Sequence, residues 1–285
     1  MLILQRVLPT GAQLNRLREG YDRIVFDFDD AIYAVPPSVR GSRLVGVAKG
    51  AGRLVTRGFP RASARRMPLI RTLRAVDACV AGNSILARFA RAHCNCVVEI
   101  PTTVAPIEEV PDRDRAPTLT WVGIADNLQY LSLIADPLAQ LRKQTEFRFT
   151  VVSSRPWLEA PIPTEFVQWS EDAEDAALLE AAVGVAPLTD DPWTRGKCAL
   201  RAIRYGGHAL PTVASPVGVT DQVVLDGETG LLARTDDEWM QALGGLLGDP
   251  GRAAAMGRRA WKRIRATYSD EVALRMWCEL LEKQA

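Results

Sequence analysis

Short apolar runs alternate with amphipathic segments throughout residues 184–232, and this alternation constrains the fold more than any other feature of the chain. An apolar run over 183–188 has the length of a buried strand, and residues 198–205 carry apolar positions at helical spacing. A second β-rich run, 210–214, leads through a Ser-Pro-Val-Gly turn toward another helix. Strands that alternate with helices in this way predict a parallel, doubly wound sheet.

Both strands of this segment end in residues suited to bind an anion. In doubly wound sheets, ligands bind outside the carboxyl ends of the strands. The loop after the first strand carries Arg195 and Lys197, and the second strand is followed by residues 218–220 at the start of a helix. Unpaired helix N–H groups beside fixed cations are what a pyrophosphate group requires. The segment therefore predicts an anion site.

A charged, proline-punctuated stretch near residues 106–117 divides the chain into two parts. In the first part we expect strands over 2–7 and 24–28 with a helix between them, and a strand and helix within 78–92. In the second part, before the segment described above, we expect strands over 119–123, 147–152 and near Phe166, and helices over 128–143 and 173–182. After that segment we expect helices over 239–247, 253–266 and 272–283.

Composition indicates a soluble protein without a metal centre. The 285 residues, 47% of them hydrophobic, suffice for one large core or two modest ones, and the net charge is +1. No apolar run approaches the ~20 residues that span a bilayer. Five scattered cysteines are typical of a reducing compartment. His93, Cys94 and Cys96 lie close together, but with two histidines in the chain and no CxxC pair we expect no metal there.

The second half of the chain resembles retaining glycosyltransferases of family 4, which have the GT-B fold. The blocks that carry the resemblance are Asp191–Cys198, Arg201–Gly207, Leu210–Gly218, Asp226–Leu232, Glu238–Trp239, Asp249–Pro250 and Met256–Gly257. Weaker similarity extends upstream through Trp121–Gly123, Ile100–Val104, Ala81–Asn83 and Phe26–Ala31. The blocks follow the family's order over most of the chain.

The resemblance implies an α/β, GT-B-like architecture of two Rossmann-like, doubly wound parallel-sheet domains. We expect an acceptor-side domain over residues 1–107, a nucleotide-sugar donor-binding domain over 108–265, and a helix in 266–285 that returns to the first domain. Family members begin with a section of roughly two βαβ-sized units that does not match this sequence, so the first domain is expected to be incomplete. A catalytically inactive donor-lobe remnant or partner subunit therefore stays an alternative to an active enzyme.

The resemblance also implies transfer of a sugar from a nucleotide diphosphate sugar to an acceptor hydroxyl with retention, without a metal or another cofactor. We expect Arg195 and Lys197, with backbone N–H groups around Gly196, to neutralise the departing diphosphate, because stabilisation that grows in the transition state accelerates the reaction. The further donor-binding residues that we expect are Thr194, Gly196, Arg204, Gly218, Val219, Thr220, Ser153 and Ser154.

The chain departs from the family pattern at two positions. Many members have two glutamates eight positions apart that contact the donor sugar and ribose, and the corresponding residues here are Gly196 and Arg204. An arginine replaces an acceptor of ribose hydrogen bonds by a pure donor. Ala209 stands where glycine is usual.

Asp27, Asp29 and Asp30 follow an apolar run and admit three interpretations. An Asp-x-Asp after a strand begins the active site of haloacid dehalogenase-type phosphatases, where one carboxylate attacks phosphorus. It also binds metal in single-domain nucleotide-sugar transferases. The third interpretation, which we favour, is a strand end whose carboxylates cap or orient neighbouring elements.

Ten basic residues and no acidic one lie between Ser38 and Val76: Arg40, Arg43, Lys49, Arg53, Arg57, Arg61, Arg65, Arg66, Arg71 and Arg74. Such a run attracts an anionic membrane surface, and the alternative is a solvated surface paired to acids elsewhere. Few aromatics interleave with the arginines, so nucleic acid is not expected. We expect a cytoplasmic enzyme of envelope polysaccharide or glycolipid synthesis that acts on a glycan or lipid-linked acceptor, with peripheral association at the inner membrane face left open.

Overall fold

The computed structural model describes residues 1–35, 62–111 and 115–282. The basic residues from Arg40 to Arg61 thus lie outside the described part. The chain forms two compact units. Unit 1 comprises residues 1–100 together with Asp191–Lys197, and unit 2 comprises residues 101–190 and 198–285.

This division differs from the domain boundaries expected from the sequence. The first unit ends at Ile100 rather than at residue 107, and it includes the loop Asp191–Lys197, which was expected in the donor-binding domain. The C-terminal helix α11 (Asp270–Glu282) is grouped with unit 2. Its return to the first domain stays a prediction.

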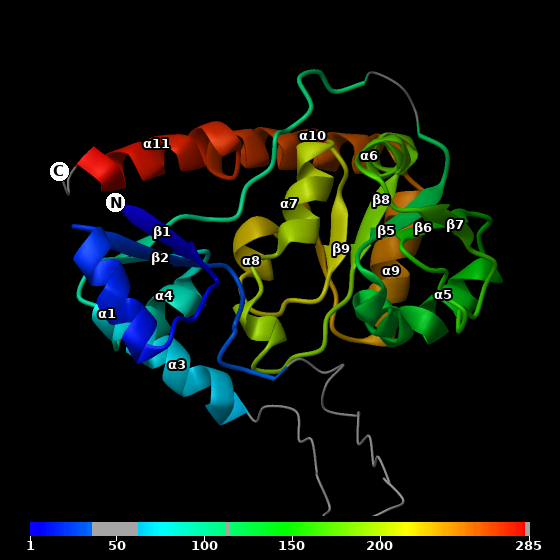
Figure 1. Ribbon diagram of the computed structural model, residues 1–285. Helices are drawn as coiled ribbons and strands as arrows, with labels where there is room; N and C mark the ends of the chain where they lie inside the picture. Colours follow the sequence, from blue (N-terminus) through cyan, green and yellow to red (C-terminus); the bar gives the residue numbers. More distant parts are fainter. Residues whose placement is uncertain (36–61, 112–114, 283–285) are drawn as a thin grey trace, which may run out of the picture. The chain divides into compact units, whose positions relative to one another are not determined.

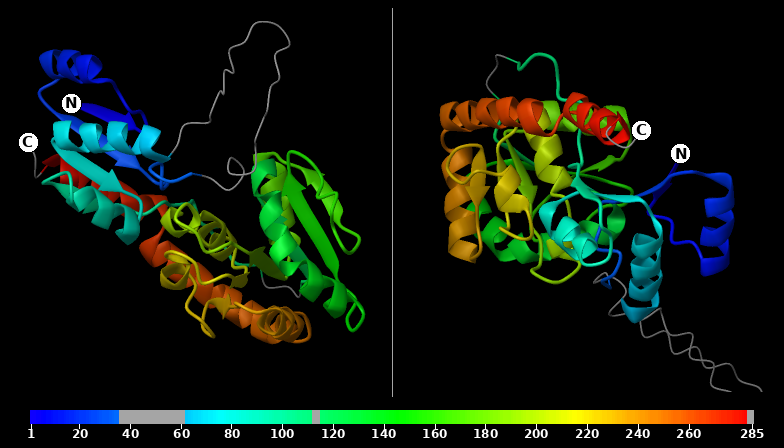
Figure 2. Two further views of the ribbon diagram at one scale, coloured as in Figure 1. Left: turned by 90° about the horizontal axis from the view of Figure 1, so that it is seen from below. Right: turned by 90° about the vertical axis from the view of Figure 1, so that its left-hand side faces the viewer.

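Unit 1 is built on a parallel sheet in the order β1-β2-β3-β4 (Figure 2, blue to cyan). The strands are β1 (Leu2–Gln5), β2 (Ile24–Phe28), β3 (Ala78–Ala81) and β4 (Val97–Glu99). They are connected through α1 (Gly11–Gly20), α3 (Ala62–Ala75) and α4 (Ser84–Arg91). Thr10 forms a capping box with Gln13 at the start of α1, and the Asn83 side chain accepts from two N–H groups at the start of α4.

Unit 2 contains a six-stranded parallel sheet in the order β10-β9-β8-β5-β6-β7 (Figure 1). The strands are β5 (Thr118–Val122), β6 (Arg148–Ser153), β7 (Glu165–Gln168), β8 (Val183–Ala186), β9 (Thr212–Ala214) and β10 (Gly230–Leu232). The chain builds outward from β5 to β7 and then resumes on the other side of β5 with β8. The doubly wound arrangement expected from the sequence is therefore confirmed.

The helices of unit 2 follow the expected order, with one helix divided. They are η1 (Ala125–Ile134), α5 (Ala135–Arg142), α6 (Glu171–Glu180), α7 (Leu200–Gly207), α8 (Thr220–Val223), α9 (Asp236–Leu247), α10 (Pro250–Thr267) and α11. The single helix expected over 128–143 is a 3₁₀ stretch followed by α5, because Pro137 has no N–H and is accommodated in the first turn of a new helix. None of the helices in the described ranges has the length and apolar character needed to cross a bilayer.

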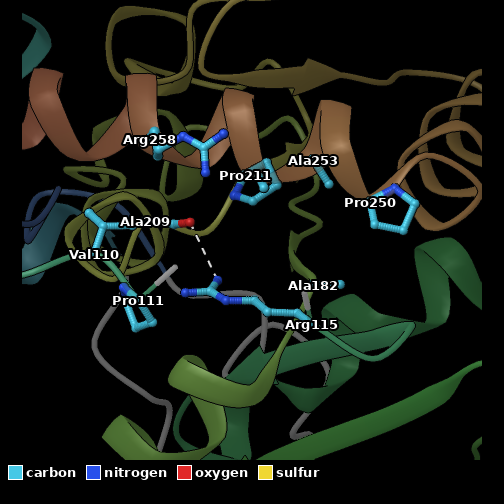
Figure 3. Close-up of a pocket in the computed structure, with 10 residues that line it drawn as sticks. Val110, Pro111, Arg115, Ala182, Ala209, Pro211, Pro250, Ala253 and Arg258 are labelled. Carbon is cyan, nitrogen blue, oxygen red and sulfur yellow. Dashed lines mark hydrogen bonds between the residues drawn. The ribbon is translucent and has the colours of Figure 1, made fainter. Parts of the chain in front are cut away.

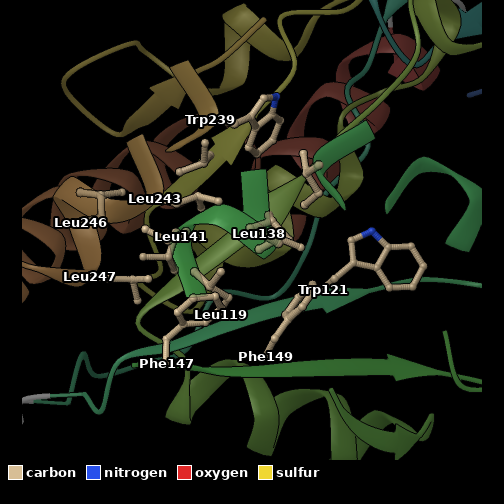
Figure 4. Close-up of a cluster of buried hydrophobic side chains, with 14 of the residues drawn as sticks. Leu119, Trp121, Leu138, Leu141, Phe147, Phe149, Trp239, Leu243, Leu246 and Leu247 are labelled. Carbon is tan, nitrogen blue, oxygen red and sulfur yellow. The ribbon is translucent and has the colours of Figure 1, made fainter. Parts of the chain in front are cut away.

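Apolar residues cover both faces of the unit 2 sheet, as expected for parallel strands. On one face, Leu119, Trp121 and Phe149 pack with side chains of α5 and α9 (Figure 4). On the other face, Val122 and Val152 pack with Leu178 of α6 and Tyr205 of α7. Because successive residues of a strand alternate between faces, this register fixes which strand-end residues lie beside which helix.

Tyr205 bridges the two central strands at the point where their pairing ends. The β5–β8 ladder stops at Thr120 and Gly184, and beyond it the Tyr205 hydroxyl accepts from the Val122 N–H at 3.1 Å and donates to the Val185 carbonyl at 3.3 Å. Burial raises the pKa of Tyr205 to about 12, so the hydroxyl keeps its proton. The ring occupies the space in which a side chain at Gly184 would lie.

Gly184→Ala should destabilise the protein, because the added Cβ would lie 2.3 Å from the Tyr205 ring. Overpacking of this kind costs about 1–3 kcal/mol. Urea unfolding followed by circular dichroism measures the loss. Gly11→Ala is the control, since its Cβ meets no atom within 4 Å and should change stability by less than about 0.5 kcal/mol. Equal stabilities of the two variants would contradict the role given to Gly184.

Candidate functional site

A guanidinium group lies at the carboxyl end of β5, where the strand order of unit 2 reverses. Arg201, in the first turn of α7, donates from Nε to the Val122 carbonyl at 2.8 Å, and its Cζ lies 4.9 Å from the centroid of the Trp121 ring. A Cβ at Gly123 would lie 2.9 Å from Arg201 Nη2, so glycine is what admits the guanidinium.

Arg201 has no ion pair with any acidic side chain in the described ranges of the chain. Burial lowers its pKa, but a guanidinium stays charged because its ordinary pKa is so high. A cation that is partly removed from water and lacks a carboxylate, at a topological switch point, is suited to an anionic ligand.

The sequence analysis did not identify Arg201 as a candidate site residue. The available signal was a charged residue on a helix whose following positions, Ala202 and Ile203, are buried.

The neighbouring strand ends bring several expected residues to the same edge of the sheet. Ser153 ends β6 and is buried, with a hydroxyl that has no hydrogen-bond partner in the described structure, and Ser154 after it is exposed. Gly218, with φ of 66°, turns the chain after β9. Val219 is buried, and the Thr220 hydroxyl donates to the Val217 carbonyl at 2.7 Å. Their contacts with a donor stay predictions.

Arg204 lies one turn after Arg201 in α7 and is held by acidic residues of α6. Its Nε pairs with Glu174 Oε1, and Nη2 lies 3.5 Å from Asp175 Oδ1. The second Glu174 oxygen, Oε2, accepts from Trp169 Nε1 at 2.7 Å. His208 Nε2 lies 3.1 Å from Asp175 Oδ1 and completes the cluster. We call Arg204, Glu174, Asp175 and Trp169 the α6–α7 network; the expected contact of Arg204 with a donor stays a prediction.

The backbone conformation of Ala209 explains why glycine is usual at this position. Its φ is 53°, a left-handed conformation that favours glycine.

The loop Asp191–Lys197 is fixed by its own hydrogen bonds and by unit 1. Asp191 Oδ1 accepts from the backbone N–H groups of Trp193 at 2.8 Å and Thr194 at 3.2 Å. Asn83 Nδ2 donates to the Gly196 carbonyl at 3.0 Å, and a Cβ at Gly196 would lie 2.4 Å from the Cβ of Ala31. These contacts are the reason that the loop belongs to unit 1.

Within this loop, Arg195 is exposed and Lys197 is half-buried. The Lys197 ammonium lies 5.5 Å from the centroid of the Trp193 ring. The backbone N–H groups of Gly196 and Lys197, expected to face a diphosphate, instead donate to the carbonyls of Trp193 and Thr194 at 3.2 and 3.1 Å. The 3₁₀ turn thus uses both groups, and their contact with a diphosphate stays a prediction.

The carboxylates after β2 are engaged with Arg6 at the end of β1. Arg6 Nε lies 3.3 Å from Asp29 Oδ1, and a second guanidinium nitrogen pairs with Asp30. Burial, with the nearby Asp29 charge, raises the pKa of Asp27 to about 6, although Gln5 and Arg6 oppose the shift. In the described ranges, no three His, Cys, Asp or Glu side chains are grouped to hold a metal ion. The ion pairs support the structural interpretation of this motif.

Asp27→Asn should stabilise the protein more at pH 7.5 than at pH 4. The folded-state pKa of about 6 exceeds the ordinary value of 3.8, so the free energy of unfolding falls as pH rises through this window. Asparagine removes that loss. Urea unfolding at both pH values measures the difference, with exposed Asp22→Asn as the control for a lost surface carboxylate. A stability difference between Asp27→Asn and wild type that is the same at both pH values would contradict the assignment.

A shallow surface cavity lies elsewhere in unit 2 (Figure 3). Its wall includes Arg258 and Arg115, and the latter donates to the carbonyls of Ala181, His208 and Ala209. It lies at the amino ends of β8 and β9, because its lining residues Ala182 and Pro211 directly precede those strands. The cavity is therefore separate from the carboxyl edge that carries Arg201.

Comparisons with known proteins agree with this architecture. Residues 116–249 match the family model described as "Glycosyl transferases group 1". A D-inositol 3-phosphate glycosyltransferase of Nocardia farcinica is 44% identical over 63 residues, which cover 21% of this chain and 14% of that relative. The chain thus matches only a small part of the length of this curated relative.

Two solved structures show the fold. Sucrose-phosphate synthase from Thermosynechococcus elongatus superposes with a TM-score of 0.64 at 18% identity, over 94% of this chain and 69% of that chain. Anabaena HepE in complex with UDP-glucose superposes with a TM-score of 0.66 at 11% identity, over 92% of this chain and 72% of that one. The two parallel-sheet units of this protein therefore have the fold of GT-B glycosyltransferases, and the glycosyl transferase group 1 match lies mostly in unit 2.

Proposed function

We propose that the protein is a retaining glycosyltransferase of family 4 that transfers a hexosyl group from a nucleotide diphosphate sugar to an acceptor hydroxyl. The observation that carries the proposal is Arg201, a guanidinium without an acidic partner among the described residues, beside Gly123 at the switch point of unit 2. The group 1 family match includes this strand end, and the HepE structure contains UDP-glucose in the same fold.

In this proposal Arg201 binds the diphosphate of the donor. Its Nε is held by the Val122 carbonyl and its Cζ lies against the Trp121 ring, so the guanidinium needs little reorganisation to meet the ligand. Glycine at 123 allows the backbone to approach the phosphate closely. Arg195 and Lys197 are proposed to neutralise the charge that develops on the departing diphosphate. The hydrogen bonds of Asp191 with Trp193 and Thr194, and of Gly196 with Asn83, hold their loop in place. No metal takes part in this proposal.

Arg201→Ala should weaken binding of UDP or GDP at least about tenfold, because a charge-assisted contact is lost. Isothermal titration calorimetry measures the affinities. Arg258→Ala, at the cavity on the opposite edge of the sheet, is the matched control and should bind like wild type.

The double variant Arg195→Ala with Lys197→Ala should reduce sugar transfer, and the anomeric proton signal of the product tests retention. Equal affinity of Arg201→Ala and Arg258→Ala would refute the proposed site, and an inverted anomer would refute retention.

The acceptor is proposed to be a glycan or lipid-linked molecule of envelope polysaccharide or glycolipid synthesis, reached at a membrane surface. Helix α3 supports this part. Arg65, Arg66, Arg71 and Arg74 are exposed on it without an ion pair to any acid that the structure describes. Met67 between them is 58% exposed, whereas Leu69 and Leu73 are buried. Exposed basic residues together with an exposed apolar residue suit the headgroup region of an anionic bilayer.

Replacing the four α3 arginines by glutamine should abolish flotation with vesicles that contain phosphatidylglycerol, since each basic residue contributes about 1 kcal/mol near such a surface. Phosphatidylcholine vesicles should not bind either protein. The charge-matched control replaces Arg155, Arg234, Arg258 and Lys262, which are exposed in unit 2, by glutamine. Equal loss in both variants would show that net charge, rather than α3, causes binding.

A further inference from the structure

Trp169 is a large aromatic residue that lies at the surface, at the carboxyl edge of the unit 2 sheet that also carries Arg201. Its side chain is 50% exposed, and it directly follows β7. The Trp169 N–H donates to the Ser153 carbonyl at 2.9 Å, so the β6–β7 ladder continues to this residue. The indole therefore lies at the carboxyl end of the sheet, beside exposed Ser154.

The ring is held in place although it is exposed. Trp169 Nε1 donates to Glu174 Oε2 at 2.7 Å, and Glu174 is itself 4% exposed and paired with Arg204 through its other oxygen. An exposed tryptophan would otherwise exchange between rotamers. Here the α6–α7 network fixes it, and a prearranged flat surface binds with a lower entropy cost than a mobile one.

The position of Trp169 fits one part of a nucleotide. Arg201 lies at the end of β5 and Trp169 at the end of β7, two strands away, with α6 and α7 on the same face of the sheet. Two strand spacings amount to roughly 10 Å, and a ribose with two phosphates covers a length of that order. A diphosphate at Arg201 would thus place the base near Trp169.

The local charge distinguishes a base from other ligand groups. Glu174 is neutralised by Arg204, whereas Glu171 and Asp172 at the start of α6 are exposed, so the surface beside the indole is acidic and disfavours a phosphate or carboxylate. A neutral aromatic face attracts a nucleobase through stacking, which every base permits, whereas a phosphate or carboxylate gains nothing from it. The same network accounts for an arginine at position 204, because it binds the carboxylate that orients Trp169.

We propose that Trp169 is the platform on which the nucleobase of the donor stacks, with Glu174 and Arg204 as positioning residues. This inference rests on the proposed function, since it assumes a nucleotide diphosphate bound through Arg201. It assigns a donor-binding role to a residue that the sequence analysis did not indicate.

Calorimetry with UDP, GDP and inorganic pyrophosphate tests the platform. Trp169→Ala should weaken the binding of the nucleotide that wild type binds about tenfold or more. Trp169→Phe keeps a ring but loses the hydrogen bond to Glu174, so its affinity should lie between those of wild type and Trp169→Ala. Pyrophosphate affinity should be unchanged in both variants, since it depends on Arg201. Glu174→Ala should weaken the nucleotide and spare pyrophosphate, which a general loss of structure would not do.

Phe166→Ala is the matched control, because Phe166 is 39% exposed on the same strand, at a position that alternation directs to the other face of the sheet. It should bind like wild type. The inference is overturned if Trp169→Ala binds the nucleotide like Phe166→Ala, or if it loses pyrophosphate to the same extent. Wild type that binds neither UDP nor GDP would instead reject the proposed function itself.

Discussion

The hydroxyl of Tyr205 determines where helix α7 meets the sheet of unit 2. It joins β5 and β8 after their ladder ends, and Gly184 provides the space for its ring. Because α7 is fixed at this point, Arg201 one turn earlier reaches the end of β5, and Arg204 beside it reaches α6. The two hydrogen bonds of this buried hydroxyl thus help to position both guanidinium groups at the carboxyl edge of the unit 2 sheet.

Much of the architecture follows from patterns that the sequence displays. The strand and helix alternation predicted parallel sheets, and the apolar runs at 119–123, 147–152 and 183–188 correspond to β5, β6 and β8. Those predictions succeed because buried parallel strands are short, apolar and bounded by turn residues. The short strands β4 and β10 were not predicted, since two apolar residues beside a glutamate or a glycine carry too little pattern to separate a strand from a turn.

The site was less predictable, because its key contacts join distant parts of the chain. Arg195 and Lys197 were chosen from local sequence, but Asn83 and Ala31 decide to which unit their loop belongs. Arg201 resembles an ordinary surface arginine until the end of β5 is placed against it. Trp169 and Glu174 likewise become meaningful only when α6 and α7 are adjacent. Contacts of this kind depend on topology rather than on spacing along the chain.

The α6–α7 network restricts which sequences can descend from this one. A glutamate at position 204, the residue type common in the resembled family, would place three carboxylates together with Glu174 and Asp175 and leave a buried charge without a counter-ion. Arg204 and Glu174 are therefore expected to be replaced only together, because either single substitution gives a destabilised protein. A change from one arrangement of this sheet edge to the other therefore requires two substitutions, and related sequences that have one arrangement are expected to keep it.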